Sequence, residues 1–235
     1  MTKKKIDIAP AGEGFSLIPN SKLLGLYTAM AQSRAAFEAA RARLPRQRIL
    51  KGAESIFGHE AALAGAAIDL KPHDTVVSTL WPQPALKAIN ASVSAAPTIA
   101  DAVRRAIAQK DNRRMTLVFS SSKAGAQASW CKAIATAAEN NLPMLFVSLD
   151  RSPGSESSLN PQDIRVNRKG YFLPVIPVDG HDVVAVYRVA TESMTYARKG
   201  HGPTVIDCRL AVLGDPLKSM ESYLALKGLK PSGFD

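Results

Sequence analysis

The stretch PVIPVDGHDVVAVYRVATESMTYARKGHGPTVIDCRLAV, residues 174–212, contains two apolar runs separated by a long helical pattern. The runs, PVIPV from Pro174 and PTVIDCRLAV from Pro203, are almost continuously apolar, as in strands that are covered on both faces. Residues 181–199 between them have the spacing of a helix. A strand, a helix and a second strand in this order predict two parallel strands joined by a right-handed crossover.

The same alternation of strand and helix patterns extends toward the N-terminus. MTLVF at Met115 and PMLFVSL at Pro143 are further apolar runs, and TVVS at Thr75 is a short strand candidate. Helical spacing occurs over residues 84–91, 98–109 and 127–140. We therefore predict an α/β protein with a doubly wound, mostly parallel sheet.

Two helices are expected before the first strand. Asn20 or Ser21 can cap the first helix, and Pro45 can end it. The apolar positions at helical spacing in it are Leu23, Leu24, Tyr27, Met30, Phe37 and Leu44. The second helix, HEAALAGAAIDL over residues 59–70, is rich in small residues, which allow another backbone to approach closely.

Length and composition predict one globular domain in a chain of 235 residues. A chain of this size buries roughly 70–75% of its unfolded surface, so its core needs no disulfide or metal. We expect a flexible basic tail over residues 1–19, one domain over 20–216 and a C-terminal tail over 217–235. The two cysteines, a start without an apolar signal region and no apolar run near 20 residues predict a cytoplasmic protein with reduced thiols.

The chain is basic, with 30 Lys and Arg against 20 Asp and Glu and a net charge of +10. This balance favours acidic partners, and nucleic acid is one of them. Six of the cations, from Arg34 to Lys51, are interleaved with Ala, Phe and Leu rather than with stacking aromatic residues. A solvated helix face is the favoured interpretation of this run.

Three segments together resemble the alpha subunit of the thiamine-diphosphate-dependent dehydrogenases of pyruvate and branched-chain 2-oxo acids. They are LLGLYTAMAQSRAAFEAARARL at Leu23 with GHEAALAGAAIDLKPHDTVV at Gly58, the unit 115–150 with ATAAENNLPMLFVSLD, and the unit 178–216. The third is the most specific of them. The resemblance implies a thiamine-diphosphate-binding-like fold, oxidoreductase chemistry on 2-oxo acids, and a beta-subunit-like partner.

The resemblance also locates a cofactor site. In that family a Gly-Asp-Gly turn after one strand and an Asn after the next hold the Mg²⁺ that binds the cofactor diphosphate. Aligned on the strand at Pro143, these positions fall on Ser121, Ser122 and Lys123 and then on Asp150 and Arg151. Mg²⁺ requires oxygen ligands, whereas Ser122 replaces a carboxylate and Arg151 places a cation beside the metal position. We therefore predict degenerate cofactor positions, no metal and no catalytic residue, and no cofactor in the isolated protein.

Two further departures from the family pattern support this prediction. LWPQP at Leu80 stands where the family has Tyr-Arg and Gly-rich contacts to the diphosphate, and LGDPLKSMES at Leu213 stands where it has a His-Gly-His-Ser loop. SSSKAGAQ at Ser120 could still hold an anion without a metal, although a serine-capped surface turn is favoured. Asp150 and Asp179 both end strands, so each can be a ligand or a turn residue.

The resulting hypothesis is a dehydrogenase alpha-subunit-like protein that is a non-catalytic subunit or scaffold. One alternative is a weakly or partner-dependently active alpha subunit, in which a beta-subunit-like partner rebuilds a site for thiamine diphosphate and Mg²⁺. A second alternative is a basic nucleic-acid-binding protein. The small residues of 59–67 and 127–140 predict self-association or a partner, and the loop 151–171 is expected to be mobile.

Overall fold

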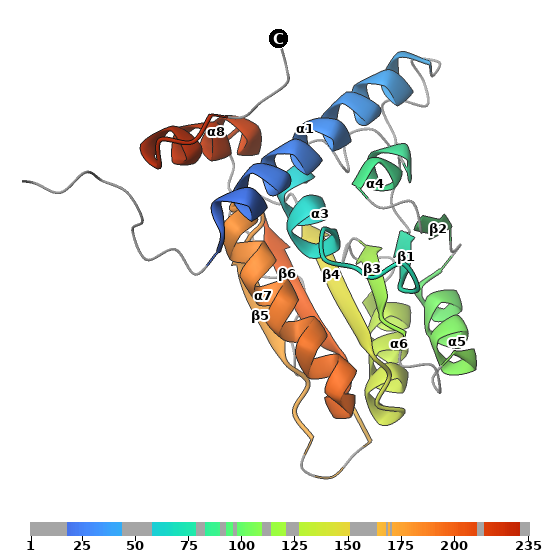
Figure 1. The fold of residues 1–235 in the computed structure, drawn as a ribbon. Helices are drawn as coiled ribbons and strands as arrows, with labels where there is room; N and C mark the ends of the chain where they lie inside the picture. Colours follow the sequence, from blue (N-terminus) through green and yellow to red (C-terminus); the bar gives the residue numbers. More distant parts are fainter. Residues whose placement is uncertain are drawn as a thin grey trace, which may run out of the picture.

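The computed structural model describes residues 18–43, 58–78, 83–89, 93–95, 98–109, 114–120, 127–150, 164–167, 169, 171–210 and 214–230. Six parallel strands in this part of the chain form a sheet with the order β2-β1-β3-β4-β6-β5 (Figure 1). The strands are β1 (Thr75–Ser78), β2 (Val93–Ala95), β3 (Thr116–Ser120), β4 (Met144–Asp150), β5 (Val175–Asp179) and β6 (Thr204–Arg209).

All five strands expected from the sequence are present, and the predicted parallel α/β sheet is confirmed. β2 was not predicted, because three residues are too few to show a pattern. The helices are α1 (Asn20–Ala42), α3 (Glu60–Ala67), α4 (Gln83–Ile89), α5 (Ile99–Ala108), α6 (Gln127–Glu139), α7 (Val183–Tyr196) and α8 (Pro216–Leu226). The turn Ala197–His201 follows α7, and the backbone leaves the helical conformation at Gly200, where φ is 86°.

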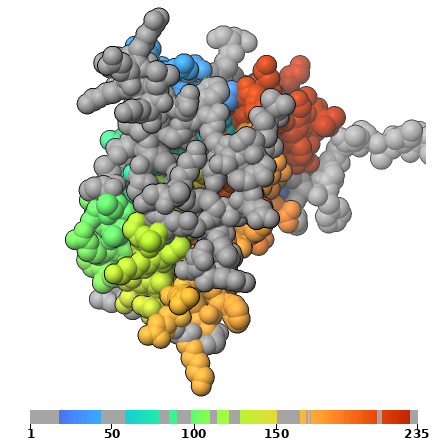
Figure 2. Space-filling view, turned by 180° about the vertical axis from the view of Figure 1, so that it is seen from behind, coloured from blue at the N-terminus to red at the C-terminus, as the bar shows by residue number. Residues whose placement is uncertain are grey.

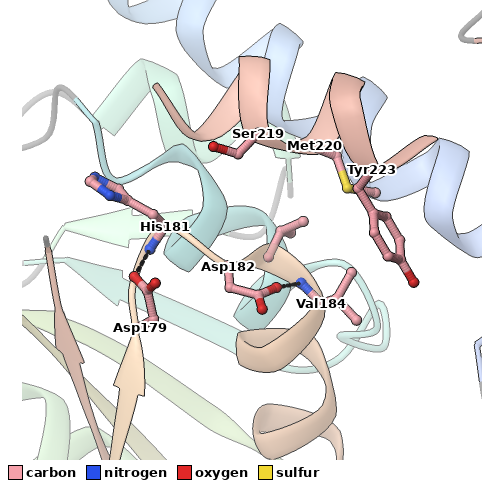
Figure 3. Close-up of a pocket in the computed structure, with 8 residues that line it drawn as sticks. Asp179, His181, Asp182, Val184, Ser219, Met220 and Tyr223 are labelled. Carbon is pink, nitrogen blue, oxygen red and sulfur yellow. Dashed lines mark hydrogen bonds between the residues drawn. The ribbon is translucent and has the colours of Figure 1, made fainter. Parts of the chain in front are cut away.

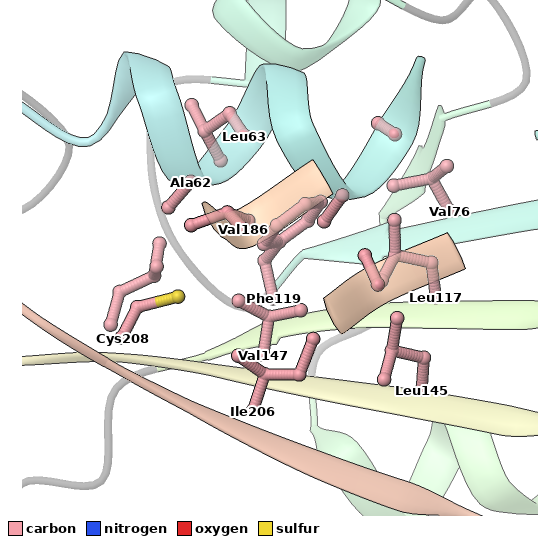
Figure 4. Close-up of a cluster of buried hydrophobic side chains, with 14 of the residues drawn as sticks. Ala62, Leu63, Val76, Leu117, Phe119, Leu145, Val147, Val186, Ile206 and Cys208 are labelled. Carbon is pink, nitrogen blue, oxygen red and sulfur yellow. The ribbon is translucent and has the colours of Figure 1, made fainter. Parts of the chain in front are cut away.

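Helices cover both faces of the sheet because side chains alternate along each strand. In β3, Val118 packs with α5 and α6, whereas Leu117 and Phe119 pack with α3, α4 and α7. Figure 4 shows Leu63 of α3 and Val186 of α7 close to the apolar side chains of the sheet. The result is a layer of helices on each face, with α1 and α8 packed outside α3 and α7 (Figure 1).

The strand β5 differs from the prediction that all the apolar runs are covered on both faces. It forms one edge of the sheet, and among its residues only Val178 is buried. Pro177 lies in the middle of this strand, which is compatible with an edge position because proline has no N–H to donate to a further strand. The same residue hinders the addition of another chain at this edge.

The start of α1 also differs from the prediction. The helix is preceded by Pro19, whose carbonyl accepts from the N–H of Leu23 at 3.1 Å, and no side chain caps this end. Asn20 and Ser21, the expected caps, lie within the first turn and are exposed. The helix ends at Ala42, three residues before the predicted stop at Pro45, which lies outside the described residues.

The expected C-terminal tail contains a helix instead. α8 begins after Asp215, whose side chain accepts from the N–H of Leu217, and its Met220 and Leu224 are buried against α1. The apolar residues of this segment have helical spacing, but their partners on α1 are distant in sequence. The expected tail over 1–19 remains a prediction, since residues 1–17 lie outside the described part.

The small residues of α3 and α6 are used inside the chain rather than on a surface for association. All eight residues of α3 are buried, and a β-carbon at Gly65 would lie 2.9 Å from the Cβ of Val186 on α7. On α6, Ala133 and Ala137 pack into the core beneath the sheet. The close helix contacts predicted from these residues therefore exist, but within one chain.

Candidate functional site

The predicted cofactor positions follow two neighbouring strands. Ser120 ends β3 and Asp150 ends β4, and the register pairs Ser120 with Ser148. Ser121, Ser122, Lys123 and Arg151 lie outside the described residues, as does most of the loop expected to be mobile, and only the backbone of Asp150 is described. Because parallel strands end at the same edge, β3 and β4 end next to each other where the two predicted segments begin in the sequence.

A row of buried polar side chains crosses the sheet immediately before this edge. Ser120, Ser148 and Asp207 are in register on β3, β4 and β6, so their side chains point to the same face, the one that α6 covers. They are 1%, 0% and 2% exposed. The sequence does not reveal this row, because each strand contributes only one residue to it, within a run that is mostly apolar.

The members of this row differ in how their polar atoms are satisfied. The indole Nε1 of Trp130 on α6 donates to Ser120 Oγ at 2.6 Å, and Arg209 Nε donates to Asp207 Oδ2 at 3.0 Å. The hydroxyl of Ser148 has no hydrogen-bond partner among the described residues. The hydrogen bond from Trp130 therefore holds the first turns of α6 to the sheet. Ser120 is also the last described residue with a hydroxyl before the predicted metal position.

A partly buried ion cluster joins three helices. Arg34 of α1 donates through Nε to Glu60 Oε1 at 3.0 Å and through Nη1 to Asp215 Oδ1 at 2.8 Å. Glu60 opens α3 and is 2% exposed, and Asp215 precedes α8. Arg34 was assigned to a solvated helix face, and this is wrong, because its side chain is only 15% exposed. The charge pattern alone could not separate it from Arg41, which is exposed.

The ion cluster shifts the pKa values of Asp215 and Arg34. Burial disfavours the ionised form of Asp215, but hydrogen bonds and the charge from Arg34 outweigh burial and hold the pKa of Asp215 below its usual value. For Arg34, burial acts to lower the pKa, and the carboxylates of Glu60 and Asp215 more than compensate, so the pKa is raised. Both groups are therefore charged at neutral pH, and the cluster links α1, α3 and α8.

A pocket of about 300 Å³ lies between the start of α7 and α8 (Figure 3). Asp179 Oδ1 accepts from the N–H of His181 at 2.9 Å, and Asp182 Oδ1 accepts from the N–H of Val184 at 2.9 Å. Both carboxylates therefore serve the turn between β5 and α7, as expected for a turn-forming aspartate at Asp179. The remaining lining residues are Val183, Ser219, Met220 and Tyr223.

The described side chains do not form a metal centre. No three His, Cys, Asp or Glu side chains gather closely enough to hold a metal ion within the described ranges. The thiol of Cys208 is fully buried in β6, and burial first, then the charges of Asp207 and Asp179, raises its pKa. No helix in these ranges is both long and apolar enough to cross a bilayer.

The fold is the one found in thiamine-diphosphate-dependent enzymes. The structure resembles that of transketolase from Campylobacter jejuni, with a TM-score of 0.51, 13% sequence identity, and coverage of 92% of this chain and 44% of that chain. At this identity the likeness concerns the fold alone.

The family is shown by the sequence over more than half of the chain. Residues 82–210 match the family model described as dehydrogenase E1 component, and the chain belongs to this family. The resemblance to alpha subunits of the 2-oxo-acid dehydrogenases is therefore confirmed.

Relatives are similar over part of their length. The chain is 31% identical over 103 residues to the alpha subunit of acetoin:2,6-dichlorophenolindophenol oxidoreductase from Bacillus subtilis, a match that covers 42% of this chain and 31% of that protein. It is 30% identical over 109 residues to the chloroplastic pyruvate dehydrogenase E1 component subunit alpha-3 from Arabidopsis thaliana. This match covers 45% of this chain and 26% of that protein. The matched region thus spans less than a third of either relative.

Proposed function

We propose that this member of the E1 family is an alpha-subunit-like protein that has lost its metal and cofactor site. It serves as a non-catalytic subunit or scaffold, paired with a beta-subunit-like partner or with itself, and a cytoplasmic location is part of this proposal. The curated relatives are named as alpha subunits, which supports a role within an assembly of subunits.

The observation that carries the proposal is the set of residues that follows β3 and β4. Ser121, Ser122 and Lys123 are bonded in sequence to the end of β3, and Arg151 is bonded to the end of β4, its neighbour in the sheet. This pair of strand ends supplies neutral hydroxyls and two cations, with Asp150 as the single carboxylate. The set does not fit Mg²⁺, which binds oxygen ligands and is repelled by cations.

The hydrogen bond between Trp130 and Ser120 supports the same conclusion. A buried indole N–H needs a partner, and here it occupies the hydroxyl of Ser120 at 2.6 Å. One lone pair of Ser120 is therefore committed to α6, and the sequence that follows it, Ser121 to Lys123, supplies no carboxylate.

A thermal melt with millimolar thiamine diphosphate and Mg²⁺ tests the loss of the site. A ligand at a hundred times its dissociation constant stabilises by about 2.7 kcal/mol, which raises the melting temperature of a domain of this size by roughly 5–11 °C. We expect a shift below about 1 °C for the isolated chain, because a ligand that occupies little of the protein adds almost nothing. A clear shift that EDTA abolishes would contradict the proposal.

The double variant Ser122→Asp, Arg151→Asn is the matched gain-of-site experiment. It returns a carboxylate to one position and removes a cation from the other, so it should bind Mg²⁺ and the cofactor better than the unchanged chain. If the unchanged chain shows the larger shift, these two residues are not the cause of the loss.

The same melt with a beta-subunit-like partner, followed by an assay of 2-oxo-acid oxidation, tests the partner-dependent alternative. Activity there would overturn the non-catalytic assignment.

A further inference from the structure

The end of the molecule opposite α1 and α8 is formed by the segments that lead into β5 and β6 (Figure 1). Tyr171 Oη donates to the carbonyl of Pro203 at 3.4 Å, and a β-carbon at Gly202 would lie 2.9 Å from the same Oη. The described residues before β5 and the turn after α7 therefore touch. Figure 2 shows the former, in light orange, projecting at the lower end of the molecule.

Aromatic side chains are exposed on both of these segments. Phe172 is 90% exposed, and Tyr196, at the end of α7, is 41% exposed. The ring of Tyr196 stacks on that of His201, with 4.5 Å between centroids and 26° between planes. A phenylalanine left almost wholly in water loses the stabilisation that burial would give, so exposed rings on two touching segments are a candidate binding surface.

Exposed cations lie on the same two segments as these rings. Arg165, Lys169 and Lys199 are exposed, and none of them forms an ion pair with another described residue. Among the described carboxylates close by, Asp74 is paired with Arg198, and Glu139 accepts the N–H of Asn167 at 3.1 Å. Glu192, one turn before Tyr196 on α7, is exposed and forms no ion pair with a described residue, so the cations outnumber the free carboxylates without being the only charges there. We call this surface the amino-edge patch, defined by Arg165, Lys169, Phe172, Tyr196, Lys199 and His201.

We propose that the amino-edge patch binds single-stranded nucleic acid. Arg165, Lys169 and Lys199 contact the phosphates, and Phe172 and the Tyr196–His201 pair stack on the bases. Unpaired bases offer flat faces of any sequence to aromatic rings, whereas the bases of a duplex are stacked on each other and are closed to this contact. The net charge of +10 adds long-range attraction for a polyanion.

The patch is independent of the degenerate cofactor positions. It lies where the parallel strands start, and those positions lie where the strands end, so binding at one edge need not involve the other. Binding of nucleic acid at this patch is therefore a property separate from the proposed function, and a negative result for one leaves the other unchanged.

Fluorescence anisotropy with a labelled oligouridine of about 20 nucleotides, longer than a typical single-strand site, tests the proposal in the full chain. Lys169→Glu with Lys199→Glu should weaken binding by more than about tenfold and lower the slope of log affinity against log salt by about 1.4, for two lost phosphate contacts. Phe172→Ala should weaken binding by about tenfold and leave the slope unchanged, because the lost contact is uncharged.

Two matched controls lie at the other end of the molecule. Lys218→Glu with Lys230→Glu makes the same change of net charge, and Leu226→Ala removes an exposed apolar side chain of 88% exposure. Both controls should keep at least half of the affinity. Circular dichroism of each variant confirms folding, which is expected because every altered side chain is exposed.

Three outcomes would overturn the proposal. Equal losses in the Lys218/Lys230 control mean that only net charge attracts the oligonucleotide. Polyglutamate that competes as well as the oligonucleotide, together with an unaffected Phe172→Ala, means that the patch fits an acidic polypeptide. If the oligonucleotide does not bind at low salt, the rings and cations of the patch do not form a nucleic-acid-binding surface.

Discussion

Gly65 of α3 lies in tight contact with α7. A β-carbon there would meet Val186 Cβ at 2.9 Å and the backbone nitrogen of Tyr187 at 3.0 Å, and backbone cannot move away cheaply. The glycine therefore sets the distance between two helices that cover the same face of the sheet. Gly25 of α1 is different, because the nearest atom to a β-carbon there is Ile68 Cδ1 at 3.7 Å.

Alanine at these two glycines should have opposite effects. Gly65→Ala should lower the free energy of unfolding by about 1–2 kcal/mol, because overpacking exceeds the gain in helix propensity. Gly25→Ala should raise it by up to about 1 kcal/mol, since propensity acts there without a clash. Urea unfolding of both variants measures the difference. Stabilisation by Gly65→Ala would show that α3 and α7 are not in close contact.

Asp215 is the residue whose charge most directly links α8 to α1. Its folded pKa is lowered, so the folded protein binds fewer protons than the unfolded chain as the pH falls. The stabilisation is therefore complete above the unfolded pKa and is lost as the pH falls through the folded value. Because the pair with Arg34 is partly exposed at Asp215, we expect about 1 kcal/mol or less from the charge.

The variant Asp215→Asn isolates this charge, since asparagine also caps helices well. We expect it to be less stable than the unchanged protein by a constant amount between about pH 5 and 8, with the difference shrinking below about pH 4. Urea unfolding across this range measures it. A difference that persists undiminished at the acid end would mean that the loss comes from the cap or from packing rather than from ionisation.

The helix α8 is held to α1 by apolar packing and by polar contacts. Met220 and Leu224 are buried among residues of α1, and Tyr27 Oη donates to Glu221 Oε1 at 2.8 Å. Burial, with smaller effects from the hydrogen bond and charge of Glu221, raises the pKa of Tyr27 to about 12. These contacts make the C-terminal segment part of the folded domain.

Two leucines of α8 provide a test of this docking. Leu224 is 0% exposed, so Leu224→Ala should cost about 2–5 kcal/mol of unfolding free energy, from lost burial and a residual cavity. Leu226 is 88% exposed, and Leu226→Ala should change stability by less than about 0.5 kcal/mol. Calorimetry of the two variants distinguishes them. Equal and small effects would indicate that the segment is a tail, as first expected.

At the scale of the whole molecule, self-association needs a surface other than the one the sequence indicated. The alanines and glycine of α3 are buried within the chain, as are Ala133 and Ala137 of α6. α1 instead exposes Ala35, Ala39 and Ala42, at spacings of four and three residues that share one face of a helix. We therefore choose this face to test for association with a second copy of the chain.

Light scattering at tens of micromolar should therefore give a mass above that of a single chain. Ala39→Arg should reduce the mass, because a long charged side chain prevents close helix contact. Ala225→Arg, at a position on α8 that is also exposed, should leave the mass unchanged. A monomer in every case would contradict self-association and leave a separate partner subunit as the form of the assembly.

The sequence by itself determined the class of fold and the family. The apolar runs at Met115, Pro143 and Pro203 became β3, β4 and β6, because the spacing of apolar residues records which faces of an element are buried. The substitutions at Ser122 and Arg151, which carry the proposed loss of the cofactor site, were also visible from sequence alone. Their placement in space stays a prediction, as both lie outside the described residues.

Only the tertiary structure decided which distant residues meet. The order of the strands places Ser120, Ser148 and Asp207 in one buried row, although 87 positions separate the first from the last by number, and Arg34 meets Asp215 across 181 positions. Local periodicity carries no information on such pairs. They depend on strand register, on the side of the sheet to which each helix crosses, and on the packing of α1 and α8 outside both.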